Sequence, residues 1–172
     1  MMLKHVTRVV AVIALAAGVA YCASAIKVVV EAEKYTKITP SMKKTASANA
    51  SGGYFIEIPV RRPHAQTEGA PADTGSTTYT VKIPSAGVWQ FWGRAMWYDA
   101  CGNSFFVKIG SNPAVQFGQD GTYGRWHWVK GPKVNLPAGN VQVVVQNRED
   151  GAKLDQFLFT KNLRYVPVRA EK

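Results

Sequence analysis

The aromatic-rich stretch 88–109, VWQFWGRAMWYDACGNSFFVKI, constrains the fold more than any other part of the sequence. Its first half alternates like a β-strand, in which successive side chains point to opposite faces. One face would carry Trp89, Phe91, Gly93, Ala95 and Trp97, and the other Gln90, Trp92, Arg94, Met96 and Tyr98. Large aromatic side chains on both faces are unusual for a strand with one face in water. Either both faces are covered by protein, or one face presents its rings to a ligand.

The second half of this stretch predicts a turn and another strand. Residues 99–103, Asp-Ala-Cys-Gly-Asn, are rich in turn-forming side chains. After them, Phe105, Val107 and Ile109 form the next apolar face. We therefore predict a hairpin, in which a strand is joined by a tight link to its partner strand, with enough aromatic area to start a core.

The remaining sequence favours an all-β domain. Beyond this hairpin, short apolar segments separated by turn signals predict strands at 26–33, 54–58, 76–83, 114–117, 126–129, 133–136, 141–146 and 154–160. Residues 37–53 and 61–75 are predicted as loops. About ten short strands favour an antiparallel β-sandwich of the jelly-roll type. The side chains expected inside it are Tyr79, Val81, Trp89, Phe91, Phe105, Val107, Val143, Val145, Phe157 and Phe159.

Residues 1–25 are typical of a secretory signal peptide. A basic start precedes an apolar run at 9–20, and Ala-Ser-Ala at 23–25 offers a cleavage site. The apolar run is short for a membrane span, so we expect no stable membrane insertion after cleavage. A lipoprotein anchored through Cys22 is the alternative, although Tyr21 is bulky where such sites need a small residue. The protein would then be secreted, acting outside the cell, at its surface or in the periplasm.

Cleavage would leave a β-sandwich domain at 26–162 and a C-terminal tail at 163–172. The formal charge would fall from +10 to +8, because Lys4 and Arg8 are lost. Cys101 would be the one remaining cysteine, so no internal disulfide could form, and we expect a partly buried apolar side chain there. Export disfavours nucleic acid as a partner, despite the positive charge.

Several short phrases follow one another in a characteristic order. They are Glu-Ala-Glu at 31–33, Gly-Gly-Tyr at 52–54, the alternating segment 79–94, Trp126, and Leu-Asp-x-Phe-x-Phe at 154–159. Their order and spacing resemble the β-sandwich carbohydrate-binding modules of families 6 and 35, over nearly all of the mature chain. The resemblance implies a non-catalytic module that binds a polysaccharide or other glycan.

The resemblance also implies a structural Ca²⁺ held by Glu31, Glu33 and Asp155. The residue types agree, because Glu31 and Glu33 project from one face and carboxylates are hard oxygen ligands for calcium. Asp155 alternates with Phe157 and Phe159, which predicts an inward-facing carboxylate. Crowded carboxylates without a cation would repel one another. The alternative is that the two glutamates face water on an edge strand.

The family's sugar site lies on loops at one end of the sandwich. Carried over, the resemblance places Tyr54, Trp126 or its neighbour Trp128, and Lys153 there, and Arg125 adds a cation beside the ring. Aromatic rings stack on apolar sugar faces, and polar groups fix the orientation. Lys153 stands where the family has asparagine, and Ile-Glu-Ile at 56–58 replaces its Gly-Asp-Trp. These departures and the positive charge favour an anionic glycan; the alternative is that Tyr54 and Trp126 belong to the core.

The leading hypothesis is therefore a secreted, non-catalytic carbohydrate-binding module. The alternative is a structural or adhesive subunit of the cell envelope, or of an extracellular assembly, in which copies self-assemble. An isolated module suits that role, because the mature chain would hold no attached enzyme. Catalysis is disfavoured, because the sequence has no nucleophile motif and no carboxylate pair that its spacing singles out.

Overall fold

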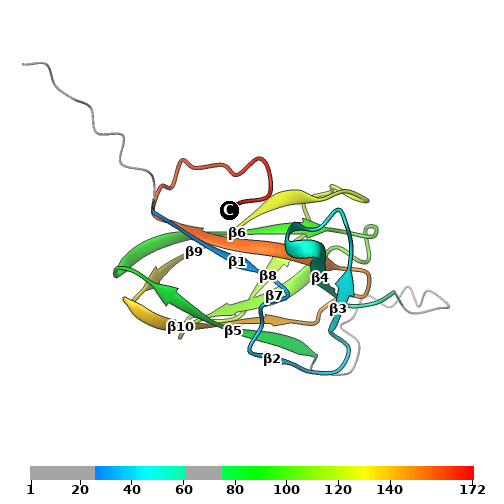
Figure 1. The fold of residues 1–172 in the computed structure, drawn as a ribbon, viewed down its shortest axis with the longest axis horizontal. Helices are drawn as coiled ribbons and strands as arrows, with labels where there is room; N and C mark the ends of the chain where they lie inside the picture. Colours follow the sequence, from blue (N-terminus) through cyan, green and yellow to red (C-terminus); the bar gives the residue numbers. More distant parts are fainter. Residues whose placement is uncertain (1–25, 61–74) are drawn as a thin grey trace, which may run out of the picture.

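The computed structural model describes residues 26–60 and 75–172. The predicted signal peptide at 1–25, and all but the last residue of the predicted loop at 61–75, lie outside the described residues. Two antiparallel sheets face each other and form a β-sandwich (Figure 1). The all-β prediction is therefore confirmed. Among the described residues, no helix is long and apolar enough to span a membrane.

The first sheet, called sheet A here, has six strands. They are β1 (Lys27–Glu31), β3 (Lys43–Ala46), β4 (Tyr54–Glu57), β6 (Gly87–Met96), β9 (His127–Leu136) and β11 (Lys153–Thr160). Their order is β3-β4-β11-β6-β9, and β1 also pairs with β11, along residues 156–160. A short 3-10 turn, η1 (Ser51–Gly53), precedes β4.

The second sheet, sheet B, has five strands. They are β2 (Lys37–Ile38), β5 (Ser76–Ile83), β7 (Ser104–Ile109), β8 (Val115–Gly118) and β10 (Gly139–Gln146), in the order β2-β5-β10-β7-β8. All ten side chains predicted to point inward are buried between the two sheets. Phe157 lies at the centre of the aromatic packing, with its ring centroid 4.9 Å from that of Tyr79 and 5.7 Å from that of Phe91.

The predicted hairpin between 88–98 and 104–109 is wrong. Strand β6 pairs with β9 and β11 in sheet A, whereas β7 pairs with β8 and β10 in sheet B. The link between them crosses from one sheet to the other. Its turn is closed by a hydrogen bond from the Tyr98 amide to the Gly102 carbonyl (3.0 Å). Trp97, just before it, packs across the core on Phe105, with ring centroids 5.9 Å apart. Non-local packing therefore overrides the local hairpin signal.

Three further sequence predictions need correction. The predicted loop at 37–53 contains the short strands β2 and β3, which pair with β5 and β4. The strands expected at 126–129 and 133–136 form one strand, β9, with an irregular register opposite Gln90 and Trp92. Pro132 has no amide hydrogen for the ladder, and the Gln90 side chain donates to the Gly131 carbonyl there (2.7 Å). Cys101 is exposed rather than partly buried, because its turn points into solvent and its amide bonds to Asp99 Oδ1 (2.8 Å).

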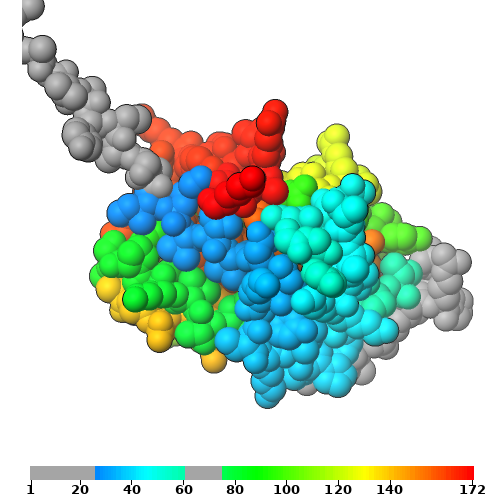
Figure 2. Space-filling model, in the orientation of Figure 1, coloured from blue at the N-terminus to red at the C-terminus, as the bar shows by residue number. Residues whose placement is uncertain are grey.

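Strand β6 is covered on both faces, as the first of the two interpretations expected. Its inner face carries Trp89 and Phe91 into the core, while Gln90 and Trp92 on its outer face are only 0% and 6% exposed. The C-terminal segment 163–172 runs over the outer face of sheet A (Figure 1). Figure 2 shows this segment, in red, packed against the start of the described chain, in blue.

The tight packing under β6 gives a first prediction. A methyl group added at Gly93 would lie 2.6 Å from Phe117 Cζ and 3.1 Å from Leu154 Cδ1. We expect Gly93→Ala to lower the free energy of unfolding by about 1–3 kcal/mol, the usual cost of overpacking a core. Urea unfolding would measure this, with the exposed Thr80→Ala in β5 as control. An unchanged midpoint for Gly93→Ala would contradict the packing described here.

Candidate functional site

Three acidic side chains meet where β1 ends, and we call Glu31, Glu33 and Asp155 the carboxylate corner. The turn after β1 is tied to β11 by a hydrogen bond from the Ala32 amide to the Asp155 carbonyl (2.9 Å). Gly52, in η1, closes over the corner, since a Cβ there would lie 2.6 Å from Glu33 Oε1 and 3.7 Å from Glu31 Cδ. Its positive φ of 64° also favours glycine.

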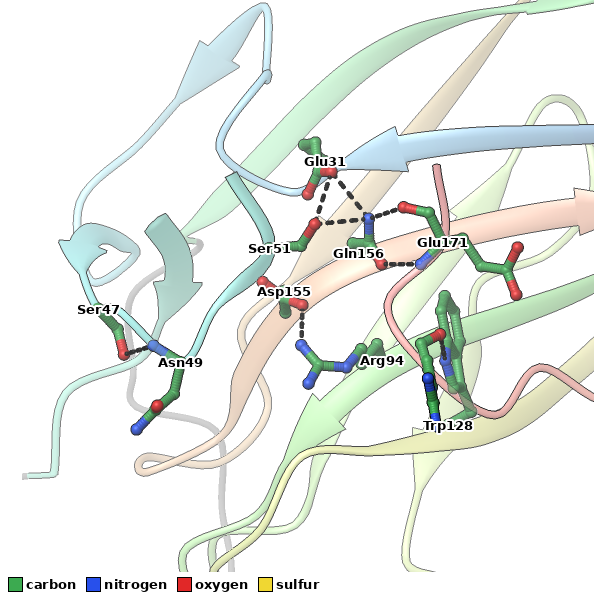
Figure 3. A network of polar contacts seen from close by, with 10 residues as sticks. Glu31, Ser47, Asn49, Ser51, Arg94, Trp128, Asp155, Gln156 and Glu171 are labelled. Atoms are coloured by element: carbon green, nitrogen blue, oxygen red, sulfur yellow. Dashed lines mark hydrogen bonds and ion pairs between the residues drawn. The ribbon is translucent and has the colours of Figure 1, made fainter. Parts of the chain in front are cut away.

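Each carboxylate of the corner keeps one buried oxygen without a hydrogen-bond partner among the described residues. These oxygens are Glu31 Oε2, Glu33 Oε2 and Asp155 Oδ1. On the other side, Glu31 Oε1 accepts hydrogen bonds from Ser51 Oγ (2.9 Å) and Gln156 Nε2 (2.8 Å), and Asp155 Oδ2 is paired with Arg94 (Figure 3). A buried carboxylate oxygen without a partner is costly. The corner therefore lacks positive charge or donors at three points.

The pKa values of the corner's carboxyl groups reflect the same lack of positive charge and hydrogen-bond donors. Burial raises the pKa of Asp155 to about 6, even though Arg94 acts in the opposite direction, and the nearby Glu31 raises it further. Burial also raises the pKa of Glu33, and Glu31 again adds to the effect. Desolvation and like charge both disfavour the ionised carboxyl groups. A bound cation would reverse both effects.

The three expected calcium ligands are chemically suited to bind a cation. Three carboxylates, each with an unpartnered buried oxygen, are the donors that Ca²⁺ prefers. Among residues 26–60 and 75–172, however, no group of three or more His, Cys, Asp or Glu side chains is placed so that it could hold a metal ion. To bind a cation, the three carboxylates would have to move closer together, and main-chain carbonyl oxygens or water would have to complete the shell.

The route by which Asp155 reaches the corner differs from the prediction. The register of β11 against β6 shifts between Leu154 and Gln156. Leu154 and Phe157 both lie in the core. Residues three positions apart would lie on opposite faces of a regular strand, so the row of inward side chains is broken at Asp155. Asp155 instead pairs with Arg94, whose strand neighbours Gly93 and Ala95 are the ones that face inward. The predicted shared face with Phe157 and Phe159 is wrong because of this bulge.

A second group of residues gathers beside the corner, and we call Phe55, Arg94, Trp126 and Lys153 the aromatic–cation cluster. The Trp126 ring meets the Phe55 ring edge-on, with centroids 5.5 Å apart. The Arg94 guanidinium lies 5.3 Å from the Trp126 centroid, and Lys153 Nζ lies 5.5 Å from the Phe55 centroid. Cations over aromatic faces attract the ring electrons. The cluster joins residues of β4, β6 and β11 to the loop before β9.

The structure brings together only some of the sugar-site residues predicted from the sequence. Trp126 and Lys153 both contact Phe55, which the sequence reasoning missed together with Arg94. Tyr54 is 42% exposed and has Lys44 Nζ 4.2 Å from its ring centroid, but it follows the opposite strand face from Phe55. Trp128 instead donates its indole hydrogen to the Arg169 carbonyl (2.9 Å), and the Arg125 side chain is exposed.

A sequence signal existed for one of the missed residues. Arg94 is the charged residue of a strand that is otherwise aromatic and apolar except for Gln90, and a charged residue in such a strand needs a buried partner. That partner is Asp155, 61 positions further along the chain. Phe55 carried no comparable signal, because an aromatic residue in a strand is ordinary core material.

No protein-family model matches the sequence, and no curated protein matches it. Solved structures do. A family 35 carbohydrate-binding module from Clostridium thermocellum is 17% identical with a TM-score of 0.61, and the match covers 77% of this chain and 97% of that module. The carbohydrate-binding module CBM6cm-2 of Cellvibrio mixtus lichenase 5A, in complex with cellotriose, is 18% identical with a TM-score of 0.58, over 78% of this chain and 96% of that one.

A larger enzyme is also similar in one part. The GH26-CBM35 β-(1,4)-mannanase of Podospora anserina is 14% identical with a TM-score of 0.60, and the match covers 82% of this chain but 29% of the enzyme. The chain thus has the fold of the non-catalytic carbohydrate-binding modules of families 35 and 6, as the sequence resemblance implied.

The Arg94–Asp155 pair gives a second prediction. Arg94→Met would leave the fully buried Asp155 carboxylate without its cation, and breaking a buried pair from one side typically costs about 3–5 kcal/mol. Urea unfolding in the presence of chelator would measure this loss. The exposed Lys82→Met serves as control. A loss as small as that of the control would show that the pair does not hold the corner together.

Proposed function

We propose that this protein is a secreted, non-catalytic carbohydrate-binding module, stabilised by Ca²⁺ at the carboxylate corner and selective for anionic glycans. The observation that carries the proposal is the aromatic–cation cluster, set on a sandwich with the fold of such modules. The half-buried Trp126 ring lies there beside the Arg94 guanidinium, and Lys153 lies over the adjoining Phe55 ring. Rings bind apolar sugar faces, and cations pair with carboxylate or sulfate groups.

The carboxylate corner would hold the calcium through Glu31, Glu33 and Asp155. When bound, the ion would supply the positive charge that three buried carboxylates lack. It would also link the end of β1, the turn η1 and the start of β11, which are far apart in the sequence. The unpartnered oxygens and the raised pKa values of Asp155 and Glu33 support this assignment.

In the cluster, the Trp126 ring would supply affinity and the cationic side chains would supply selectivity. An exposed ion pair contributes only about 0–1 kcal/mol, so stacking on Trp126 would supply much of the affinity. Lys153 and Arg94 would then favour glycans that carry carboxylate or sulfate. Arg94 also pairs with Asp155, so a cation at the corner, by sharing that carboxylate, would leave more of the guanidinium charge for a ligand.

A structural or adhesive subunit is the second candidate. It is favoured by the exposed apolar side chains on and beside the C-terminal segment, which are Ile26, Leu163, Val166 and Val168. Val168 is 85% exposed. Single exposed apolar side chains are common on protein surfaces, whereas several that lie together favour contacts between proteins. Size-exclusion chromatography at several concentrations would separate this role from glycan binding by a monomer.

Calcium gives the third prediction. A ligand that binds only the native state stabilises it by mass action, by about 2.7 kcal/mol at a concentration of 100 Kd. We expect chelator to lower the melting temperature of the wild type, and Glu33→Gln to remove this sensitivity. Glu57→Gln, which changes a glutamate outside the corner, should leave it intact. Identical melting curves with calcium and with chelator, after confirmed metal removal, would reject the calcium site.

Glycan selectivity gives the fourth prediction. Calorimetry with a polyuronate, a sulfated glycan and a neutral glycan should show preference for the first two, and their binding should weaken as salt screens the charges. Trp126→Ala should weaken binding of every glycan about tenfold or more, which corresponds to about 1.4 kcal/mol.

The charged residue should behave differently from the ring. Lys153→Asn should weaken binding of the anionic glycans and spare the neutral one. Lys82→Asn on sheet B is the matched control, since it removes an exposed lysine from the other sheet. Equal binding of neutral and anionic glycans would discard the anionic preference, and no binding of any glycan would discard the function itself.

A further inference from the structure

The C-terminal segment is held on sheet A mainly through its main chain. It turns back at Asn162, whose carbonyl accepts a hydrogen bond from the Tyr165 amide (3.0 Å). The Trp128 indole then donates to the Arg169 carbonyl (2.9 Å), and the Glu171 carboxylate contacts both Lys27 and the Tyr165 hydroxyl. Pro167 is buried. The segment is thus a specific strap over the sheet.

Gln156 attaches to this strap through two hydrogen bonds. Its Nε2 donates to the Glu171 carbonyl (2.9 Å), and its Oε1 accepts from the Glu171 amide (2.9 Å), so both ends of one side-chain amide bind one residue (Figure 3). Gln156 is 0% exposed. A buried amide that is fully committed in this way fixes the position of what it binds.

The same amide nitrogen also reaches the carboxylate corner. Gln156 Nε2 lies 2.8 Å from Glu31 Oε1 and 3.0 Å from Ser51 Oγ, in addition to the Glu171 carbonyl. A side-chain amide carries two hydrogens, so three acceptors compete for them. Figure 3 shows the network converging on this one nitrogen from β1, η1 and the strap.

We propose that Gln156 links cation binding at the carboxylate corner to docking of the C-terminal segment, so that each favours the other. This linkage rests on the calcium site of the proposed function. A cation draws on the lone pairs of Glu31 and weakens its competition for the amide hydrogens. Gln156 then donates more fully to the Glu171 carbonyl. In return, a docked strap fixes Gln156 and, through it, the orientation of the Glu31 carboxylate.

Thermodynamic linkage makes the effect reciprocal. If calcium tightens docking of the strap by some factor, docking must tighten calcium binding by the same factor, and such couplings are typically about fivefold or more. The Glu171 side chain contacts Lys27 and Tyr165 on the strap's far side from the corner. Replacing this side chain removes these two contacts and leaves in place the main-chain groups of Glu171 that bond to Gln156.

The test uses the full chain and measures both directions. Trypsin cleavage after the exposed Arg164 and Arg169 reports undocking of the strap, and we expect calcium to slow it about fivefold or more in the wild type. Gln156→Leu should remove this effect. Calorimetry should show about fivefold weaker calcium binding in Glu171→Ala, with the exposed neighbour Lys172→Ala as control. If Gln156 had only a structural role, the substitution Glu171→Ala would leave the calcium affinity unchanged.

The outcomes separate the two proposals. No calcium binding by the wild type would reject the calcium site of the proposed function, and the linkage with it. The linkage alone would be overturned if the wild type bound calcium, but calcium did not slow trypsin cleavage and Glu171→Ala bound calcium as tightly as the wild type. If Gln156→Leu fails to fold, the calorimetry of Glu171→Ala still decides, because that residue lies in the strap.

Discussion

Burial of strand β6 on both faces is the constraint on which the rest of the structure depends. Its inner face supplies Trp89 and Phe91 to the core, and its outer face carries Gln90 and Trp92, which are equally hidden from water. A sheet with two apolar faces must be covered twice. Sheet B covers the inner face, and the C-terminal segment lies over the outer one. The segment is therefore part of the fold.

Arg94, on the outer face of the same strand, joins the two candidate sites. Its guanidinium pairs with Asp155 of the carboxylate corner and lies over the ring of Trp126 in the aromatic–cation cluster. Metal binding and ligand binding would therefore act on one shared charge. A cation that took part of the Asp155 carboxylate would change what Arg94 offers to a ligand, which would give the corner a role beyond stability.

Much of this arrangement follows from sequence patterns, and the remainder depends on contacts that no local pattern encodes. Alternation identified β6 and the ten core side chains, because the period of a strand is fixed by its geometry. The resemblance selected Glu31, Glu33 and Asp155, and Glu31 lies near enough to the other two to raise the pKa of each; their role as calcium ligands stays a prediction. The crossing link after Trp97, the bulge at Asp155 and the partnership of Arg94 with Asp155 depend on pairing between distant strands. The strap has no strand periodicity, because it is held by scattered contacts, which are main-chain bonds to Trp128 and Gln156 and the ion pair of Glu171 with Lys27.

A high-resolution crystal structure of residues 26–172, from crystals grown with millimolar calcium, tests this account most directly. The account predicts an ion at the corner, bound by Glu31 Oε2, Glu33 Oε2 and Asp155 Oδ1 at about 2.3–2.6 Å, with carbonyl or water oxygens completing the shell. A corner without an ion, in which the three carboxyl groups are protonated and bond to one another or to water, would contradict it.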